Sequence, residues 1–246
     1  MKILFGVVSV NHIPINEISI LSKSVKKHFL INHDVDFVVF SDVENLPNIE
    51  NVIYINVDNN HTKLTTYYQF QKLLSLNYVN LDEYDFIFVC DSDSVFVNEV
   101  LDSDLLTHEL SLLSHFGKIN AKDLFNQWTD VFELNNDIEH TMGNFFGGSS
   151  NVIKQLLEFT NKIWGKYKNH NFSNTGFFSL HSEEVVIIKF LSESNIVEKR
   201  LTSSLDYYQS AFLTDFKGNG NLLNNLHNFK LIHDTKYFFK LYDSIF

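Results

Sequence analysis

Apolar residues recur along the first hundred positions in two spacings, one typical of buried strands and the other of helices. Continuous apolar runs of strand length lie at residues 3–10, 35–40, 52–57 and 86–90. Between them, residues 17–29 and 65–79 carry apolar side chains three or four positions apart, which predicts helices with one buried side. The order strand, helix, strand, strand, helix, strand predicts an α/β fold with a Rossmann-like, mostly parallel central sheet and helices on both faces.

The second half of the chain is less regular. Helical spacing returns at residues 153–167 and 184–191, whereas residues 101–114 fit a helix or a strand. Residues 141–150, TMGNFFGGSS, predict an aromatic strand that ends in a tight turn at Gly147-Gly148, with Ser149 or Ser150 capping the next helix. No linker or repeat interrupts the 246 residues, so we expect a single domain.

Composition and charge narrow the class of protein. The net charge of −11 argues against nucleic acid or an anionic membrane as the main partner, although a bound divalent cation permits an anionic ligand. The single cysteine, Cys90, allows no internal disulfide. No apolar run approaches the roughly 18 residues of a transmembrane segment. We therefore expect a soluble, cytoplasmic protein without such a segment.

Polar residues follow several of the predicted strands. Asn11 and Asp42 follow the first two, and Asp91-Ser92-Asp93 directly follows the fourth. Ligands of parallel sheets bind beyond the carboxyl ends of the strands. Alternation along an extended chain would place the Asp91 and Asp93 carboxylates on one side, where they suit Mn²⁺ or Mg²⁺. The alternative is a polar turn without a ligand.

The carboxylates need a cation if their ligand is a diphosphate. Without one, each close pair of like charges at about 4 Å costs on the order of 4 kcal/mol. A second acidic group, His181-Ser182-Glu183-Glu184, opens a predicted helix. The helix dipole alone explains acidic residues in a first turn, whereas the functional alternative aims a carboxylate at a reacting atom of the substrate.

Four segments resemble glycosyltransferase family 6, which includes the blood-group A and B transferases and the α-1,3-galactosyltransferases. They are LSKSVKKHFLINHDVDFVVFSD, FIFVCDSDSVF, MGNFFGGSSNVIKQL and LHSEEVVIIKFL, and they follow the family's order within residues 1–210. The resemblance implies a GT-A fold, Mn²⁺, a UDP-galactose or UDP-N-acetylgalactosamine donor, and α-1,3 transfer to a glycan acceptor with retention of configuration. It also implies a nucleotide-binding half at residues 1–100, an acceptor-binding half at 101–215 and a C-terminal segment at 216–246.

The resemblance assigns roles to individual residues. Asp91, Ser92 and Asp93 would meet the metal and the diphosphate, and Glu183 would be the nucleophile or would stabilise the sugar cation. The other donor and nucleotide positions are Val8, Ser9, Val10, Asn11, Met142 and Asn144. The acceptor positions are His115, His181 and Ser182.

Several positions depart from the family pattern. Leu180 replaces its tryptophan and Ser182 its aspartate, and its donor-binding arginine has no arginine counterpart, so that Lys63 or Lys72 would substitute. The tail from residue 218 onward, rich in aromatics and with Lys230 and His233, either closes over the donor or packs as an ordinary C-terminal segment.

Three other functions stay open. The chain fits a GT-A transferase of another family, such as family 8, which shares the D-x-D after a strand. It also fits a non-catalytic module that binds a sugar nucleotide or a glycan, an alternative that the changes at Leu180 and Ser182 keep open. A phosphatase with an aspartate nucleophile is disfavoured, because no supporting lysine or threonine pattern is visible near Asp91.

Overall fold

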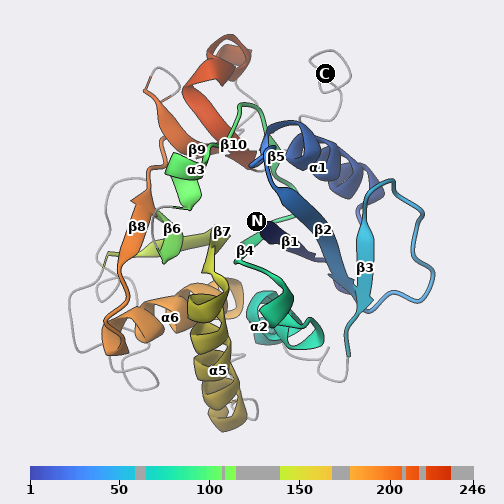
Figure 1. Ribbon diagram of the computed structural model, residues 1–246, viewed down its shortest axis with the longest axis vertical. Helices are drawn as coiled ribbons and strands as arrows, with labels where there is room; N and C mark the ends of the chain where they lie inside the picture. Colours follow the sequence, from blue (N-terminus) through green and yellow to red (C-terminus); the bar gives the residue numbers. More distant parts are fainter. Residues whose placement is uncertain are drawn as a thin grey trace.

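A computed structural model describes residues 1–58, 65–106, 109–114, 139–167, 178–206, 209–215 and 220–233. The central sheet has seven strands in the order β3-β2-β1-β4-β7-β6-β8 (Figure 1). Their bounds are β1 Lys2–Val8, β2 Asp34–Ser41, β3 Ile53–Asn56, β4 Phe86–Cys90, β6 Leu110–Ser114, β7 Thr141–Ser149 and β8 Glu198–Leu201. A second sheet has the order β5-β10-β9, with β5 Val95–Phe96, β9 Ala211–Asp215 and β10 Phe229–His233.

Helices cover both faces of the central sheet. The α-helices are α1 Ile15–His28, α2 Thr65–Leu74, α3 Asp102–Leu105, α5 Ser150–Tyr167 and α6 Phe178–Glu193, and the 3₁₀ helices are Ser75–Tyr78, Leu81–Glu83 and Gly220–Asn228. Helices α2, α5 and α6 lie on one face, while α1 and the second sheet lie on the other (Figure 1). The prediction of an α/β fold with a mostly parallel sheet and helices on both faces is confirmed.

Strand alternation builds a core on each side of the sheet. Leu4 of β1 and Val89 of β4 belong to the cluster formed with α2, α5 and α6, whereas Phe5 and Phe88 belong to the cluster formed with α1. Phe5, Phe88 and Phe145 are fully buried. The continuous apolar runs of the sequence are therefore strands with both faces covered. No helix in the described part of the chain is long and apolar enough to cross a membrane.

The glycine pair at 147–148 lies inside β7, so the predicted turn is wrong. A Cβ on Gly147 would lie 2.5 Å from the Ile87 carbonyl oxygen of β4, and one on Gly148 would collide with the Glu109 carbonyl beside β6. The glycines therefore let β7 pack closely between its two neighbours. Helix α5 begins at Ser150 without an intervening turn. The ambiguous residues 101–114 form the short helix α3 and strand β6.

The topology brings the carboxyl ends of β1 and β4 and the first residues of β7 close together. From β1 the chain proceeds outward to β2 and β3 and then returns to β4 on the other side of β1, which makes the β1–β4 boundary a switch point of the kind where α/β sheets bind ligands. Strand β7 pairs antiparallel with β4. Its first residues consequently lie where β4 ends, and the Asp91 N–H donates to the Asn144 carbonyl at 2.9 Å.

Candidate metal centre

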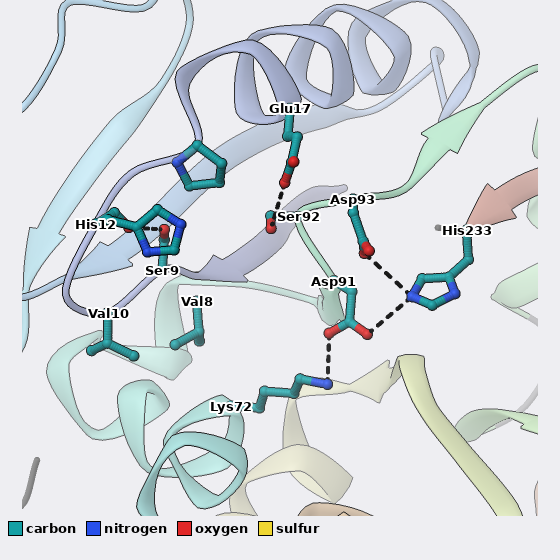
Figure 2. Close-up of a pocket in the computed structure, with 11 residues that line it drawn as sticks. Val8, Ser9, Val10, His12, Glu17, Lys72, Asp91, Ser92, Asp93 and His233 are labelled. Carbon is teal, nitrogen blue, oxygen red and sulfur yellow. Dashed lines mark hydrogen bonds and ion pairs between the residues drawn. The ribbon is translucent and has the colours of Figure 1, made fainter. Parts of the chain in front are cut away.

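A cleft of about 400 Å³ opens at the carboxyl ends of β1 and β4 (Figure 2). Its volume falls within the range of small-molecule sites. The described residues that line it are Val8, Ser9, Val10, His12, Pro14, Glu17, Lys72, Asp91, Ser92, Asp93 and His233. Seven predicted donor and nucleotide positions therefore line one cleft, namely Val8, Ser9, Val10, Lys72, Asp91, Ser92 and Asp93. The predicted positions Asn11 and Asn144 are not among the described residues that line it.

Asp91, Asp93 and His233 converge at one wall of this cleft. The His233 Nε2 atom lies 3.6 Å from Asp91 Oδ2 and 3.2 Å from Asp93 Oδ1, and one ligand atom from each residue lies within 4.8 Å of the others (Figure 2). Residues 92–93 form a turn rather than the predicted extended segment. Within it the Ser92 hydroxyl points away toward Glu17 Oε2 at 3.5 Å, which leaves both aspartates facing His233.

Further polar groups orient these three side chains. Asp215, at the end of β9, contacts His233 Nδ1 through Oδ1 at 2.9 Å. Asn144 of β7 lies with Nδ2 3.2 Å from Asp91 Oδ2 and 2.9 Å from His233 Nε2. A carboxylate on the far nitrogen of a histidine fixes the ring's tautomer and orientation in metal sites. The Asp215–His233 pair has this arrangement.

The electrostatics of the cluster favour a cation. Burial lowers the pKa of His233, but hydrogen bonds to Asp215 and Asp93 and the charge of Asp91 outweigh it and raise the pKa to about 10. In the absence of a metal, the imidazolium of His233 is thus the cation that balances these carboxylates, and a divalent ion bound there would replace its Nε2 proton. Two carboxylates and one imidazole suit Mn²⁺ better than Mg²⁺, because Mg²⁺ prefers oxygen ligands alone. The three residues could therefore hold a divalent metal ion.

Lys72 of α2 connects Asp91 to Glu183. Its Nζ atom lies 2.6 Å from Asp91 Oδ1, and it donates to Glu183 Oε1 at 2.9 Å and to the Gly143 carbonyl at 3.2 Å. Burial would lower the pKa of Lys72, but the charges of Asp91 and Glu183 outweigh it and hold the pKa above its usual value. The side chain is therefore an ammonium ion at the edge of the cleft.

Glu183 lies on the buried helix α6 and its side chain is only 3% exposed. Burial raises its pKa to about 7, although Lys72 opposes the shift. The next residue, Glu184, accepts from the Gly143 N–H at 2.7 Å and contacts His140 Nε2 at 3.0 Å. Glu184 thus holds the start of β7 through the Gly143 N–H. Glu183 itself is absent from the described residues that line the cleft.

The end of β1 forms the opposite wall of the cleft. Val8, Ser9 and Val10 line it, and the Ser9 hydroxyl donates to the His12 carbonyl at 2.7 Å (Figure 2). Asn11 has a left-handed backbone with φ of 69°, which asparagine tolerates better than most residues. Its N–H donates to Asp42 Oδ1 at 2.6 Å. The predicted meeting of these two strand ends is confirmed.

The remaining predicted residues have different positions. Met142 packs in the apolar core beside α1 and does not line the cleft. Helix α6 begins at Phe178, so the prediction that His181 opens the helix is wrong, and Glu183 and Glu184 lie beyond its first turn. The side chains of His181 and Ser182 lie outside the described part. His115, Lys63 and the tail beyond residue 233 also lie outside the described residues.

The sequence alone names His233 only as part of a tail that either closes over the donor or packs as an ordinary segment, and it offers no reason to single out Asp215. The pattern FKLIH, an apolar strand with a terminal histidine, is the available signal for His233. Strand β10 pairs in parallel with β9, and this pairing aligns His233 with Asp215. Comparison with known proteins adds no assignment, because no protein-family model and no curated protein matches the chain.

Proposed function

We propose that the chain is a metal-dependent glycosyltransferase of the GT-A fold that uses a nucleotide diphosphate sugar. The observation that carries the proposal is the convergence of Asp91, Asp93 and His233 on one point. They lie at the switch point of the sheet, in a cleft that also contains Lys72. Bound there, a divalent ion would neutralise charge on a diphosphate leaving group.

The chain's own residues supply the rest of a donor site. Asp91, Asp93 and His233 would hold the cation, with Asn144 and Asp215 fixing their orientation. The end of β1 would receive the nucleoside, because it lines the cleft opposite the aspartates. Val10 and Val8 offer an apolar surface for a base, while the ribose and the diphosphate would extend toward Asp91.

In the proposed reaction the bond between the anomeric carbon and the diphosphate breaks, and a bond from that carbon to an acceptor hydroxyl forms. The hydroxyl proton passes to the departing diphosphate, so no separate base is needed. Following the family 6 resemblance, the donor is UDP-galactose or UDP-N-acetylgalactosamine and the product is an α-1,3-linked glycan with retained configuration. A family 8-like donor site would use the same aspartates.

Turnover of donor sugars tests the proposal. Purified protein is incubated with Mn²⁺ and a panel of UDP-sugars, with and without mixed oligosaccharide acceptors, and released UDP is measured. We expect slow hydrolysis of one donor that stops with EDTA and falls at least a hundredfold in Asp93→Asn. A matched Asp34→Asn variant, which changes an exposed residue at the amino end of β2, should retain activity. UDP release that is equal in both variants would refute the role of the cluster.

One observation favours a second function. The sequence shows no supporting lysine near Asp91, yet the fold brings Lys72 Nζ to 2.6 Å from its carboxylate. A phosphatase could use such a lysine-paired aspartate as a nucleophile: Asp91 would attack phosphorus, the alcohol would leave, and water would hydrolyse the aspartyl phosphate. Phosphate release from p-nitrophenyl phosphate with Mg²⁺ or Mn²⁺, in the absence of UDP-sugar turnover, would identify this function.

A further inference from the structure

Lys72 stands between the cleft and Glu183. Its Nζ atom lies 2.6 Å from Asp91 and 2.9 Å from Glu183. Lys72 lines the cleft, whereas Glu183 does not, and the Glu183 side chain is 3% exposed. A molecule bound against Asp91 would therefore meet the ammonium group before it could meet the Glu183 carboxylate.

The backbone of β7 closes the other side of Glu183. A Cβ on Gly143 would collide with Glu183 Oε1, so the carboxylate lies directly against this glycine. Gly143 is itself held, through its N–H, by Glu184 at 2.7 Å. The carboxylate is thereby fixed in a narrow space, where it accepts a hydrogen bond from the Lys72 ammonium group. This position suits a group that orients a lysine better than a nucleophile that must reach a sugar carbon.

Lys72 also has the charge that a diphosphate needs. Among the described residues that line the cleft, it is the one lysine or arginine, in a chain whose net charge is −11. Its ammonium group adjoins Asp91, which is the carboxylate nearest to it in the candidate metal centre. A diphosphate bridging the cation and Lys72 would therefore have positive charge on two sides.

We propose that Lys72 binds the donor diphosphate and that Glu183 is a positioning residue that acts through Lys72 rather than attacking the sugar. This inference rests on the proposed function. It assigns the two residues separable effects, because glutamine at position 183 keeps an oxygen that can accept from Lys72 Nζ. Leucine at the same position removes that acceptor.

Binding of Mn²⁺ with inorganic pyrophosphate provides a test that needs no turnover. Calorimetry is performed on the wild type, Lys72→Met, Lys72→Arg, Glu183→Gln and Glu183→Leu, and Mn²⁺ is also titrated alone to isolate the diphosphate contact. We expect Lys72→Met to weaken pyrophosphate binding at least tenfold beyond any change in Mn²⁺ affinity. Glu183→Gln should stay within threefold to fivefold of the wild type, because its amide oxygen can still accept from Lys72, and Glu183→Leu should resemble Lys72→Met. Lys72→Arg should bind pyrophosphate more tightly than Lys72→Met, because it keeps the positive charge.

Kinetics on the identified donor then separates positioning from nucleophilic attack. We expect kcat to fall about 10²–10³-fold in Lys72→Met but less than about tenfold in Glu183→Gln. The double variant Lys72→Met/Glu183→Gln should have the same kcat as Lys72→Met, because Glu183 acts only through Lys72. A Glu183→Gln protein as inactive as Lys72→Met but with unchanged pyrophosphate binding, or a glycosyl ester on Glu183 detected by mass spectrometry, would overturn the inference.

The outcomes also separate this inference from the function on which it rests. Wild-type protein that binds Mn²⁺ and pyrophosphate in a Lys72-dependent way but turns over no UDP-sugar would refute glycosyl transfer alone. Wild-type protein that turns over a UDP-sugar with no loss in Lys72→Met would refute the inference alone. Wild-type protein that neither binds pyrophosphate with Mn²⁺ nor turns over a UDP-sugar would refute both.

Discussion

Replacing Asp215 by asparagine should weaken Mn²⁺ binding even though Asp215 is not a proposed ligand. The Asp215 carboxylate lies 2.9 Å from His233 Nδ1. Asparagine keeps the size and one acceptor oxygen but loses the charge. A hydrogen bond to a charged group contributes about 1.5–3 kcal/mol and a neutral one about 0.5–1.5 kcal/mol, so the change removes about 1–1.5 kcal/mol. We therefore expect Mn²⁺ affinity to fall about tenfold, at the lower end of the range for residues that orient metal ligands.

Electron paramagnetic resonance measures this affinity directly, since the signal of free Mn²⁺ falls as the ion binds. Asp34→Asn is the matched control, because it removes the same charge from an exposed position at the amino end of β2. A thermal melt of each variant shows whether the fold is kept. Equal Mn²⁺ affinities in Asp215→Asn and Asp34→Asn would refute the idea that Asp215 holds His233 for the metal.

Four further substitutions test the packing of β7 and α5 and the environment of the buried Glu183. Gly147→Ala should lower the free energy of unfolding by about 1–3 kcal/mol, because its Cβ would lie 2.5 Å from a carbonyl oxygen. Gly165→Ala, in a helix with nothing within 4 Å of the new Cβ, should raise the free energy of unfolding by about 0.5–1 kcal/mol. Urea titration measures both changes. Gly143→Ala should displace the Glu183 carboxylate and lower turnover on the order of 10²-fold, measured as UDP release, and unchanged turnover would contradict this. The pKa of Glu183 is raised to about 7, so the stability that its protonated form contributes is full below about pH 4 and is lost as the pH rises to 7. Glutamine does not titrate, so Glu183→Gln should gain stability relative to the wild type between pH 4 and pH 7, as measured by urea titration. A difference in stability that stays constant over this range would contradict the shift.

The elements that form the cleft floor could be predicted because their signals are local. The run FIFVC is apolar at every position and becomes β4, with residues 87–90 buried. Parallel strands end at one edge of a sheet, so the order of the strands alone predicts Asp91 near Val8 and Val10. The same reasoning explains why Asn11 and Asp42, which follow β1 and β2, come within hydrogen-bonding distance.

The rest of the site depends on contacts between distant segments. His233 reaches the aspartates because β10 belongs to a second sheet on the α1 face, and no local pattern specifies that sheet. Lys72 meets Glu183 because α2 packs against α6, and helical spacing alone does not reveal which helices are neighbours. The prediction of a turn at Gly147 is wrong because glycine favours turns in general, whereas here it is required by the closeness of β4.

Calorimetric titration of UDP into the protein with and without Mn²⁺ tests the central claim most directly. If Asp91, Asp93 and His233 hold a cation that binds a nucleoside diphosphate, the wild type should bind UDP only with Mn²⁺ present, and Asp93→Asn should lose at least tenfold in affinity under the same conditions. UDP binding of equal strength without Mn²⁺ and in Asp93→Asn, or no UDP binding at all, would contradict the account.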